Sequence, residues 1–232
     1  YYMNYRVMIN HTRVIRSAMG ATVNFEEDKQ TLFLPQIRIG SPEFDNFHDT
    51  QNGTATNRFA GPPSILLPED IMTGGEALKE ILREEVNTRY RFAITSIERA
   101  KANKGVKVEN EDKSPDFTAI KAEKYFEPAL KGDRIALDTD YWQKQLNKYS
   151  AIFAENKDII NANATLSFKI WRKYFVSTEG TEIAENRTYV ILSIRANSMA
   201  EDGMELPLNK SYFAFFPDEL PSPSQIEKDM RE

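Results

Sequence analysis

Alternating apolar and polar positions dominate the last third of the chain. Apolar side chains share one face from Leu166 to Val176 and again from Thr188 to Ala196. Turn sequences follow each run, at Thr178–Thr181 and at Asp202-Gly203. This period of two predicts two strands, with a third from Met204 to Phe216. Because no helix separates the three strands, we expect an antiparallel meander.

The first forty residues also favour strands. Apolar runs lie at Tyr5–Ile9, Arg13–Val23 and Thr31–Ile39. Gly20 interrupts the second run and indicates a bulge there. The acidic stretch Glu26–Asp28 predicts a polar turn between the second and third strands.

Helical periodicity appears between these two β-rich regions, after a loop predicted for residues 41–73. The spacing predicts a long helix from Thr73, where Glu76 completes a capping box, to Lys104, before Gly105. Its expected core stripe consists of Leu78, Leu82, Val86, Tyr90, Ala93 and Ile97. A second helix is predicted from Thr139, with Trp142, Leu146, Tyr149 and Phe153 on one face. A third begins after Ser222, with Pro223 at its first position and Gln225 completing the box.

Strands gather at both ends of the chain instead of alternating with helices. This order predicts an α+β fold with a largely antiparallel or mixed sheet, one long helix and one or two shorter packed helices. The length of 232 residues allows one large domain or two small ones. The chain opens on Tyr1-Tyr2 and closes in the start of a helix, so we interpret it as a piece of a longer protein.

Composition removes several classes of function. The net charge of -5 and the lack of a long basic run disfavour nucleic-acid binding. The absence of cysteine excludes disulfides, thiolate nucleophiles and zinc-thiolate sites. No stretch approaches the roughly 20 apolar residues of a membrane helix.

Candidate catalytic chemistry is sparse. The two histidines are His11, which we expect in an exposed turn, and His48. Asp45, His48 and Asp49 offer oxygen and nitrogen ligands for a divalent ion, although a polar turn explains the same residues. Nucleophile elbows and phosphate-binding loops are missing. The sequence therefore predicts no catalytic residue in this chain.

Several short segments, in a shared order, resemble the N-terminal region of the TldD/PmbA family, whose members are often named modulators of DNA gyrase. They are listed in chain order: Tyr1–Val7, Ser17–Ala21, Ile37–Gly40 with Phe44–Asn46, Leu67–Asp70, Tyr90–Ala93, Pro115–Phe117, Thr178–Thr181 and Asp202–Met204. The resemblance covers nearly the whole chain, with little contribution from residues 41–65 and 119–138. Thr178 stands where the family pattern has serine.

The resemblance implies a single N-terminal domain over residues 1–232 of a zinc metallopeptidase. Zinc in that family is held by a His-Glu-x-x-x-His motif that follows this region, and the present sequence has no such motif. The implied partners are the chain's own C-terminal catalytic domain, a homodimeric or heterodimeric family member, and a peptide substrate, with neither nucleic acid nor membrane. The implied compartment is the cytoplasm, although relatives with export signals leave the periplasm open.

The role implied for this chain is to shape the substrate cleft and contribute to dimer contacts. The family-motif turns are Thr178, Glu179, Gly180, Asp202 and Gly203, and the strand after the second turn is a candidate peptide-facing edge with Met204, Leu206 and Tyr212. An edge covered by the parent's second half is the competing interpretation. Two other functions stay open. One is a peptide- or protein-interaction domain in a family member without peptidase activity, and the other is an independent enzyme that uses Asp45, His48 and Asp49.

Overall fold

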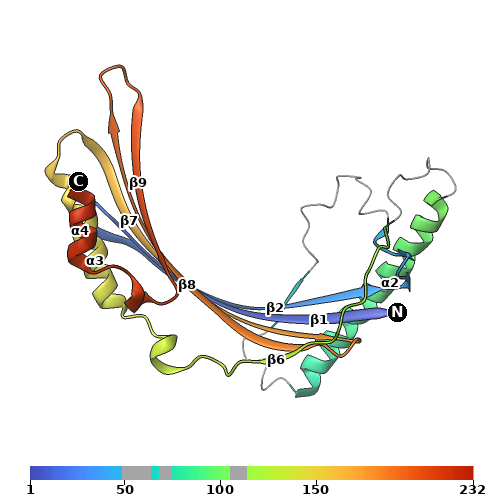
Figure 1. Cartoon of the computed structure of the whole chain (residues 1–232). Coiled ribbons are helices and arrows are strands. Elements are labelled where there is room, and N and C mark those ends of the chain that lie inside the picture. Colours follow the sequence, from blue (N-terminus) through green and yellow to red (C-terminus); the bar gives the residue numbers. More distant parts are fainter. Residues whose placement is uncertain (49–63, 68–74, 105–113, 232) are drawn as a thin grey trace. The chain divides into compact units, whose positions relative to one another are not determined.

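The computed structural model describes residues 1–48, 64–67, 75–104 and 114–231 (Figure 1). Predictions that fall on other residues, among them the Thr73 cap, the Gly105 stop and the position of Asp49, lie outside this part. The fold is α+β, as the sequence predicts, with a mostly antiparallel seven-stranded sheet and the long helix α2 (Gly75–Lys104).

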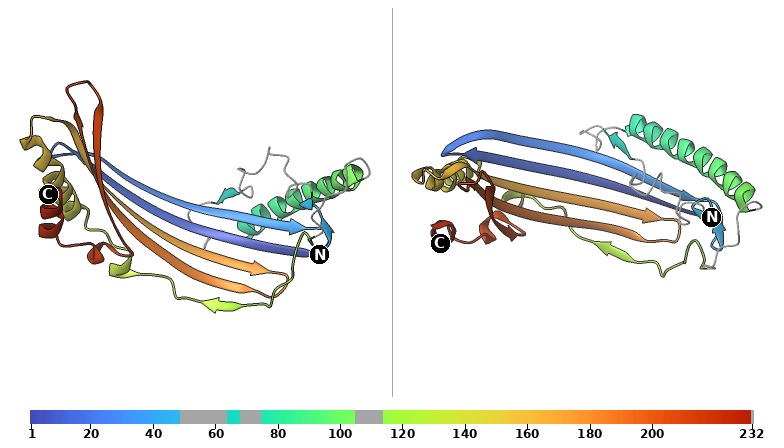
Figure 2. Two further views of the ribbon diagram at one scale, coloured as in Figure 1. Left: turned by 45° about the horizontal axis from the view of Figure 1, so that its top comes forward. Right: turned by 90° about the horizontal axis from the view of Figure 1, so that it is seen from above.

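Four long strands are the central strands of the sheet, and they lie side by side in both views of Figure 2. They are β1 (Tyr2–Ala18), β2 (Ala21–Arg38), β7 (Ile159–Ser177) and β8 (Glu182–Met199). The strand order is β5-β2-β1-β7-β8-β6, and β9 (Glu205–Ala214) pairs with β8 beyond this path. The short strands are β5 (Ile65–Leu67), antiparallel to β2, β6 (Lys124–Phe126), parallel to β8, and the pair β3 (Gly40–Ser41) and β4 (Phe44–Asp45).

A two-residue turn at Met19 and Gly20 joins β1 to β2. Their φ angles are 47° and 92°, the positive values that a type I′ hairpin turn requires. The predicted bulge at Gly20 is therefore wrong, because the glycine reverses the chain. The predicted turn at Glu26–Asp28 is also wrong, since β2 continues through it. Cross-strand pairing overrides the local polarity of these three acids.

The strands β1 and β7 run antiparallel. The Thr178 backbone N–H donates to the Met3 carbonyl over 2.9 Å, and the Met19 N–H donates to the Ala162 carbonyl over 3.1 Å. The N-terminal end of β1 thus lies beside the C-terminal end of β7, and the C-terminal end of β1 lies beside the N-terminal end of β7.

Two further hairpins confirm the predicted meander of β7, β8 and β9. In the first turn, the Ser177 N–H donates to the Thr181 carbonyl and Gly180 has a φ of 92°. In the second, the Ala200 N–H donates to the Met204 carbonyl and Gly203 has a φ of 86°. Both are three-residue loops that end on a left-handed glycine, which forms a bulge at that point.

The described chain separates into two compact units. Unit 1 consists of residues 1–9, 30–128 and 173–185, and unit 2 of residues 10–29, 129–172 and 186–232. The four long strands contribute residues to both. The assignment of the whole chain to a single domain stays a prediction.

The core of unit 2 lies between the sheet and two helices, α3 (Thr139–Ile152) and α4 (Pro223–Arg231), which lie side by side in Figure 1. The predicted helix face is confirmed, because Trp142, Leu146 and Tyr149 are buried. The strand residues packed against them are Ile15, Ala164, Leu166, Phe168, Val190, Leu192, Ile194 and Ala214. Removing these apolar surfaces from water supplies the main driving force for folding this unit.

Caps define where both helices begin. The Asp138 carboxylate accepts the Tyr141 N–H at the start of α3 over 2.9 Å. The Ser222 hydroxyl accepts the Gln225 N–H at the start of α4, as the capping sequence predicts.

In unit 1, helix α2 is buried only near its C-terminal end. Ala93, Ile97 and Ala100 are buried, whereas Tyr90 is 48% exposed. The predicted stripe is therefore confirmed at Ala93 and Ile97 but wrong at Tyr90. Gly40, with a φ of +115°, permits close approach here, since a Cβ at this position would lie 2.7 Å from Ile97 Cδ1.

Candidate functional site

Strand β9 presents an open edge in unit 2. Within the described residues it pairs only with β8. The hydrogen bond from Ala200 to Met204 closes the hairpin, and the register pairs Ser198 with Leu206 and Asn197 with Pro207. Hydrogen-bonded and non-hydrogen-bonded pairs alternate along an antiparallel ladder. The backbone groups of residues 205, 207, 209, 211 and 213 therefore point away from β8.

Pro207 divides this edge into two parts. Proline has no N–H, so the edge lacks a donor at that position near the hairpin tip. Such a residue discourages pairing with another strand. Asn209, Ser211 and Phe213 beyond it keep both the donor and the acceptor. The usable edge is therefore the stretch from Asn209 to Phe213.

Side chains on one face of β9 lie toward α4. The Tyr212 hydroxyl donates to Asp229 Oδ2 over 2.8 Å. Burial and the neighbouring Asp229 carboxylate raise the pKa of Tyr212 above its ordinary value. The pKa of Asp229 is lowered, because Tyr212 and then Gln225 donate hydrogen bonds to the ionised carboxylate. These contacts hold β9 against the helical side of unit 2.

The opposite face of the same strands carries a row of aromatic rings, which we call the aromatic row: Trp171, Tyr189, Phe213 and Phe215. Successive ring centroids are 6.2, 6.3 and 5.7 Å apart. Phe213 and Phe215 are 62% and 61% exposed. The Lys169 ammonium lies 5.7 Å from the Tyr189 ring centroid.

An open strand edge beside exposed rings can bind an extended peptide. Unpaired backbone donors and acceptors supply hydrogen bonds that do not depend on sequence, and the side chains beside them select the peptide. Exposed aromatic surface of this kind marks interaction sites in soluble proteins. The aromatic row includes Phe213, which also belongs to the open edge. One extended peptide can therefore contact the edge and the rings together.

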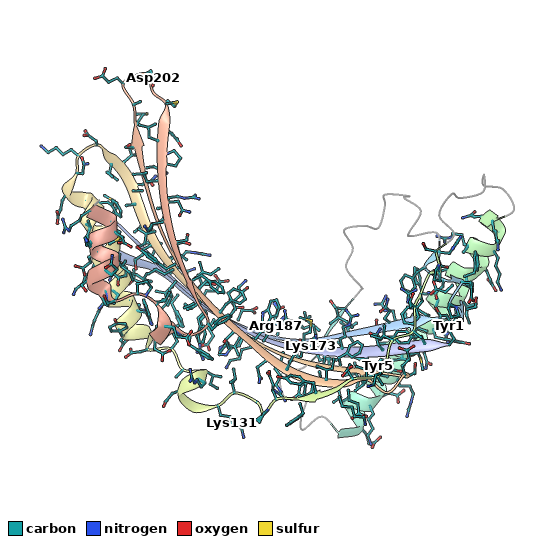
Figure 3. All side chains as sticks on the ribbon, in the orientation of Figure 1. Tyr1, Tyr5, Lys131, Lys173, Arg187 and Asp202 are labelled. Carbon is teal, nitrogen blue, oxygen red and sulfur yellow. The ribbon has the colours of Figure 1, made fainter. Side chains whose placement is uncertain are left out.

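The predicted edge residues occupy different positions along this surface. Met204 and Leu206 are exposed near the hairpin tip, whose Asp202 is labelled in Figure 3. Tyr212 is half-buried and bonded to Asp229. Their role in binding stays a prediction.

The two family-motif turns fall in different units. In unit 1, the Thr178 hydroxyl accepts the Met3 N–H over 3.0 Å, and Gly180 reverses the chain after Glu179. In unit 2, the Asp202 carboxylate accepts the Met204 N–H over 3.0 Å, beside Gly203. Turn geometry and strand pairing account for the threonine, the aspartate and both glycines.

The predicted ion-binding residues Asp45 and His48 lie in a polar network of unit 1. Asp45 is fully buried, and its carboxylate accepts from Arg38 over 2.5 Å, from the Tyr1 hydroxyl over 2.8 Å and from the Phe47 N–H over 2.7 Å. His48 Nδ1 lies 3.0 Å from both carboxylate oxygens of Asp116. Within the described residues, no group of three or more His, Asp or Glu side chains could hold a metal ion.

Sequence reasoning missed the other members of this network. The Arg38 guanidinium lies 4.6 Å from the Phe47 ring centroid and 4.8 Å from that of Phe117. Asp116 joins through its carboxylate, which accepts the Asp45 N–H over 2.8 Å. Arg38 precedes Asp116 by 78 residues, so no local spacing connects them. Burial and the Asp45 carboxylate also raise the pKa of Tyr1.

His11 does not lie in an exposed turn, which corrects the sequence-based expectation. It lies in the middle of β1 with Nε2 2.5 Å from Glu27 Oε1. Glu27 also accepts from Arg13 over 3.0 Å. Burial lowers the pKa of His11, against the opposing effect of Glu27.

No helix in the described part of the chain is long and apolar enough to span a membrane. Comparison with protein-family models and with curated proteins found no match.

Comparison with solved structures found similar folds. A protein from Bacteroides thetaiotaomicron named "putative modulator of DNA gyrase" matches 99% of the chain with a TM-score of 0.61 and 11% identity. A protein of the same name from Thermotoga maritima matches 98% with a TM-score of 0.51 and 10% identity. The chain has the fold of these proteins. TldE from Thermococcus kodakarensis also matches, with a TM-score of 0.49 and 10% identity over 99% of the chain.

The first two matches confirm, at the level of the fold, the resemblance to the proteins named modulators of DNA gyrase. The chain spans 45%, 42% and 43% of the three proteins, less than half of each. Nearly all of its own length is matched.

The aromatic row is the part of the candidate site that sequence reasoning overlooked. Trp171, Tyr189, Phe213 and Phe215 occupy the positions between the core residues of their strands. Aromatic residues on both faces of an alternating run were the available signal, because a solvated face usually carries polar side chains.

Proposed function

We propose that this chain is the N-terminal, non-catalytic domain of a TldD/PmbA-like zinc metallopeptidase, in which it shapes the substrate cleft and contributes to dimer contacts. The fold match over nearly the whole chain, but less than half of the matched proteins, supports a domain role. Zinc would be held by residues outside this sequence, which contains two histidines and no cysteine.

The open β9 edge is the observation that carries the peptide-handling role. A peptide backbone would pair with Asn209, Ser211 and Phe213, extending the sheet by one strand. Side chains on alternate positions of the peptide would then meet the aromatic row. Pro207 would end the pairing on one side and thereby set where the peptide lies along β9.

Two substitutions at the same position test this pairing in the complete gene product. Ser211→Pro deletes an N–H that points away from β8, whereas Ser211→Ala removes only the hydroxyl. We expect the proline variant to lose peptide binding and the alanine variant to keep it. The measurement is amide hydrogen exchange of residues 209–213 with and without an extended peptide. Unchanged exchange in the wild-type protein would exclude the β9 edge as the binding site.

A peptide- or protein-interaction domain from a family member without peptidase activity is the second candidate. The exposed aromatic row supports an interaction domain as well as it supports a peptidase domain, because peptide binding does not require the catalytic half. Elemental analysis separates the two functions. About one zinc per complete polypeptide is the stoichiometry of a single three-ligand catalytic site and supports the peptidase. Peptide binding by a zinc-free complete protein supports the interaction domain.

A further inference from the structure

The face of unit 2 that carries the aromatic row, which we call the aromatic face, also carries positive charge. On β7 and β8 the side chains at odd positions lie on this face, because those at even positions, such as Leu166 and Leu192, form the core. The cations among them are Lys169, Arg187 and Arg195. Among the described residues of β7, β8 and β9 in unit 2, the single carboxylate on this face is Glu205, at the hairpin tip.

Arg195 is the cation of the aromatic face that lies beside the peptide edge. It pairs across the ladder with Asn209, one of the edge residues that keep both a donor and an acceptor. Its side chain is exposed, and no ion pair or hydrogen bond of its guanidinium occurs among the described residues. Lys169, in contrast, lies over the Tyr189 ring. The Arg195 guanidinium is therefore available to a bound group.

A peptide added to the β9 edge would bring its own side chains within reach of Arg195. Its residues opposite Asn209, Ser211 and Phe213 would place their side chains on the aromatic face, because directly paired residues share a face. The peptide would lie two strand spacings, about 10 Å, from β8. The long side chains of Arg195 and of a peptide glutamate can meet across this distance, since Asn209 between them is short and uncharged.

We propose that the β9 edge selects an extended peptide with an acidic residue opposite Asn209 and an aromatic or apolar residue opposite Phe213. The Arg195 guanidinium pairs with the acidic side chain, and the aromatic row covers the apolar one. Three residues separate the two peptide positions, because Asn209 and Phe213 are four positions apart. This inference rests on the proposed peptide-handling role and names the class of peptide that the edge takes.

Cations beside exposed rings also suit single-stranded nucleic acid. The backbone groups of Asn209 and Ser211 that point away from β8 favour a peptide. A peptide backbone offers N–H and C=O groups at the repeat of the strand itself, and a sugar–phosphate backbone does not. A peptide is thus the occupant that satisfies both the open edge and the cation.

Blocked heptapeptides test this selection on the complete gene product, with a zinc chelator present so that no peptide is cleaved. One peptide is acetyl-Thr-Phe-Thr-Val-Thr-Glu-Thr-amide, and the other has the reverse order, because a peptide can run in either direction along β9. In the neutral control Gln replaces Glu. In the isomeric control Glu moves one position toward the centre, which keeps the net charge and turns the carboxylate to the opposite face.

Fluorescence anisotropy of the labelled peptides measures the dissociation constants. In one of the two orders, we expect the Glu peptide to bind about fivefold tighter than either control. Arg195→Gln should remove this preference and leave the affinity for the Gln peptide within about twofold. Arg195→Glu should reverse it, so that a peptide with Lys at the same position binds tighter. The matched control is Arg16→Gln, which removes an exposed cation from β1 and should keep the preference.

Equal affinity for the Glu and Gln peptides, with residues 209–213 protected from amide exchange by both, would overturn the acidic selection and leave the peptide edge intact. A preference that survives Arg195→Gln would overturn the role of Arg195. Failure of every peptide to bind would overturn the peptide edge together with this inference. Displacement of the Glu peptide by a uridine hexanucleotide, lost in Arg195→Gln, would assign the cation to nucleic acid and overturn the choice of a peptide.

Discussion

The hydroxyl of Tyr212 on β9 donates a hydrogen bond of 2.8 Å to the Asp229 carboxylate on α4. This bond joins the last strand of the meander to the last helix. It is also the largest cause of the lowered pKa of Asp229. Asp229 thus links β9 to α4 through Tyr212 and also through Lys210, whose ammonium lies 3.8 Å from Asp229 Oδ2.

Tyr212→Phe should raise the pKa of Asp229 toward its ordinary value. A depressed carboxyl pKa contributes stability above the ordinary pKa, and that stability is lost as the pH falls through the folded-state pKa. The variant should therefore show a shallower loss of stability in acid than the wild-type protein. NMR titration of the Asp229 carboxyl carbon measures the shift, and the unrelated Asp218 carboxyl is the control. An unchanged Asp229 titration would contradict the assigned cause.

The protein should lose stability above pH 10, the ordinary value for tyrosine. Burial raises the pKa of Tyr149, so the folded state keeps a proton that the unfolded chain releases. Stability that is complete below the ordinary pKa is then lost as the pH rises. Tyr149→Phe should reduce this alkaline loss, and at neutral pH it should leave stability unchanged or raise it by about 1 kcal/mol, because its hydroxyl is unpaired. Urea unfolding at neutral and alkaline pH measures both effects.

Asp45→Asn should destabilise unit 1 by about 3 kcal/mol, because it leaves the largely buried Arg38 guanidinium without its charged partner. The matched control is Glu80→Gln on α2, whose pair with Arg83 is 66% exposed on both sides. We expect that change to cost less than about 0.5 kcal/mol, since exposed ion pairs contribute little. Hydrogen exchange of unit 1 amides measures the difference, and equal effects would contradict the buried-pair argument.

Gly40→Ala should cost several times more stability than Gly132→Ala. Both glycines have a positive φ, +115° and +61°, which strains any residue with a Cβ. At Gly40 the new Cβ would also clash with the backbone carbonyl oxygen of Phe44 and lie 2.7 Å from Ile97 Cδ1, whereas at Gly132 it meets nothing within 4 Å. We expect about 1 kcal/mol at Gly132 and 3 kcal/mol or more at Gly40. Thermal unfolding of the two variants compares them directly.

Leu192→Ala should destabilise unit 2 by about 3 kcal/mol, the usual cost of emptying a packed leucine site. Leu192 is 0% exposed in β8, and Leu208 of the neighbouring β9 is 69% exposed. The same substitution at Leu208 should cost less than about 0.5 kcal/mol. Similar losses of stability in the two variants would contradict the exposed position of Leu208.

Local periodicity was sufficient to predict much of this protein. The meander of β7, β8 and β9 follows from alternation and from the glycines at its turns, and α3 follows from the three- and four-residue spacing of Trp142, Leu146 and Tyr149. These signals succeed because they arise within a few neighbouring residues. The same local reasoning failed at Glu26–Asp28, where pairing with another strand decides the structure.

Only the tertiary structure determined which surfaces are candidate binding sites. The ion pair of Arg38 with Asp45 and its link to Asp116, and the aromatic row, each join residues far apart in the chain. The sequence by itself determined that the chain forms strands and helices in an α+β order and that its two histidines and absent cysteines limit its metal chemistry. The binding surfaces depend on strand order and register, which set distances between residues that local sequence cannot relate.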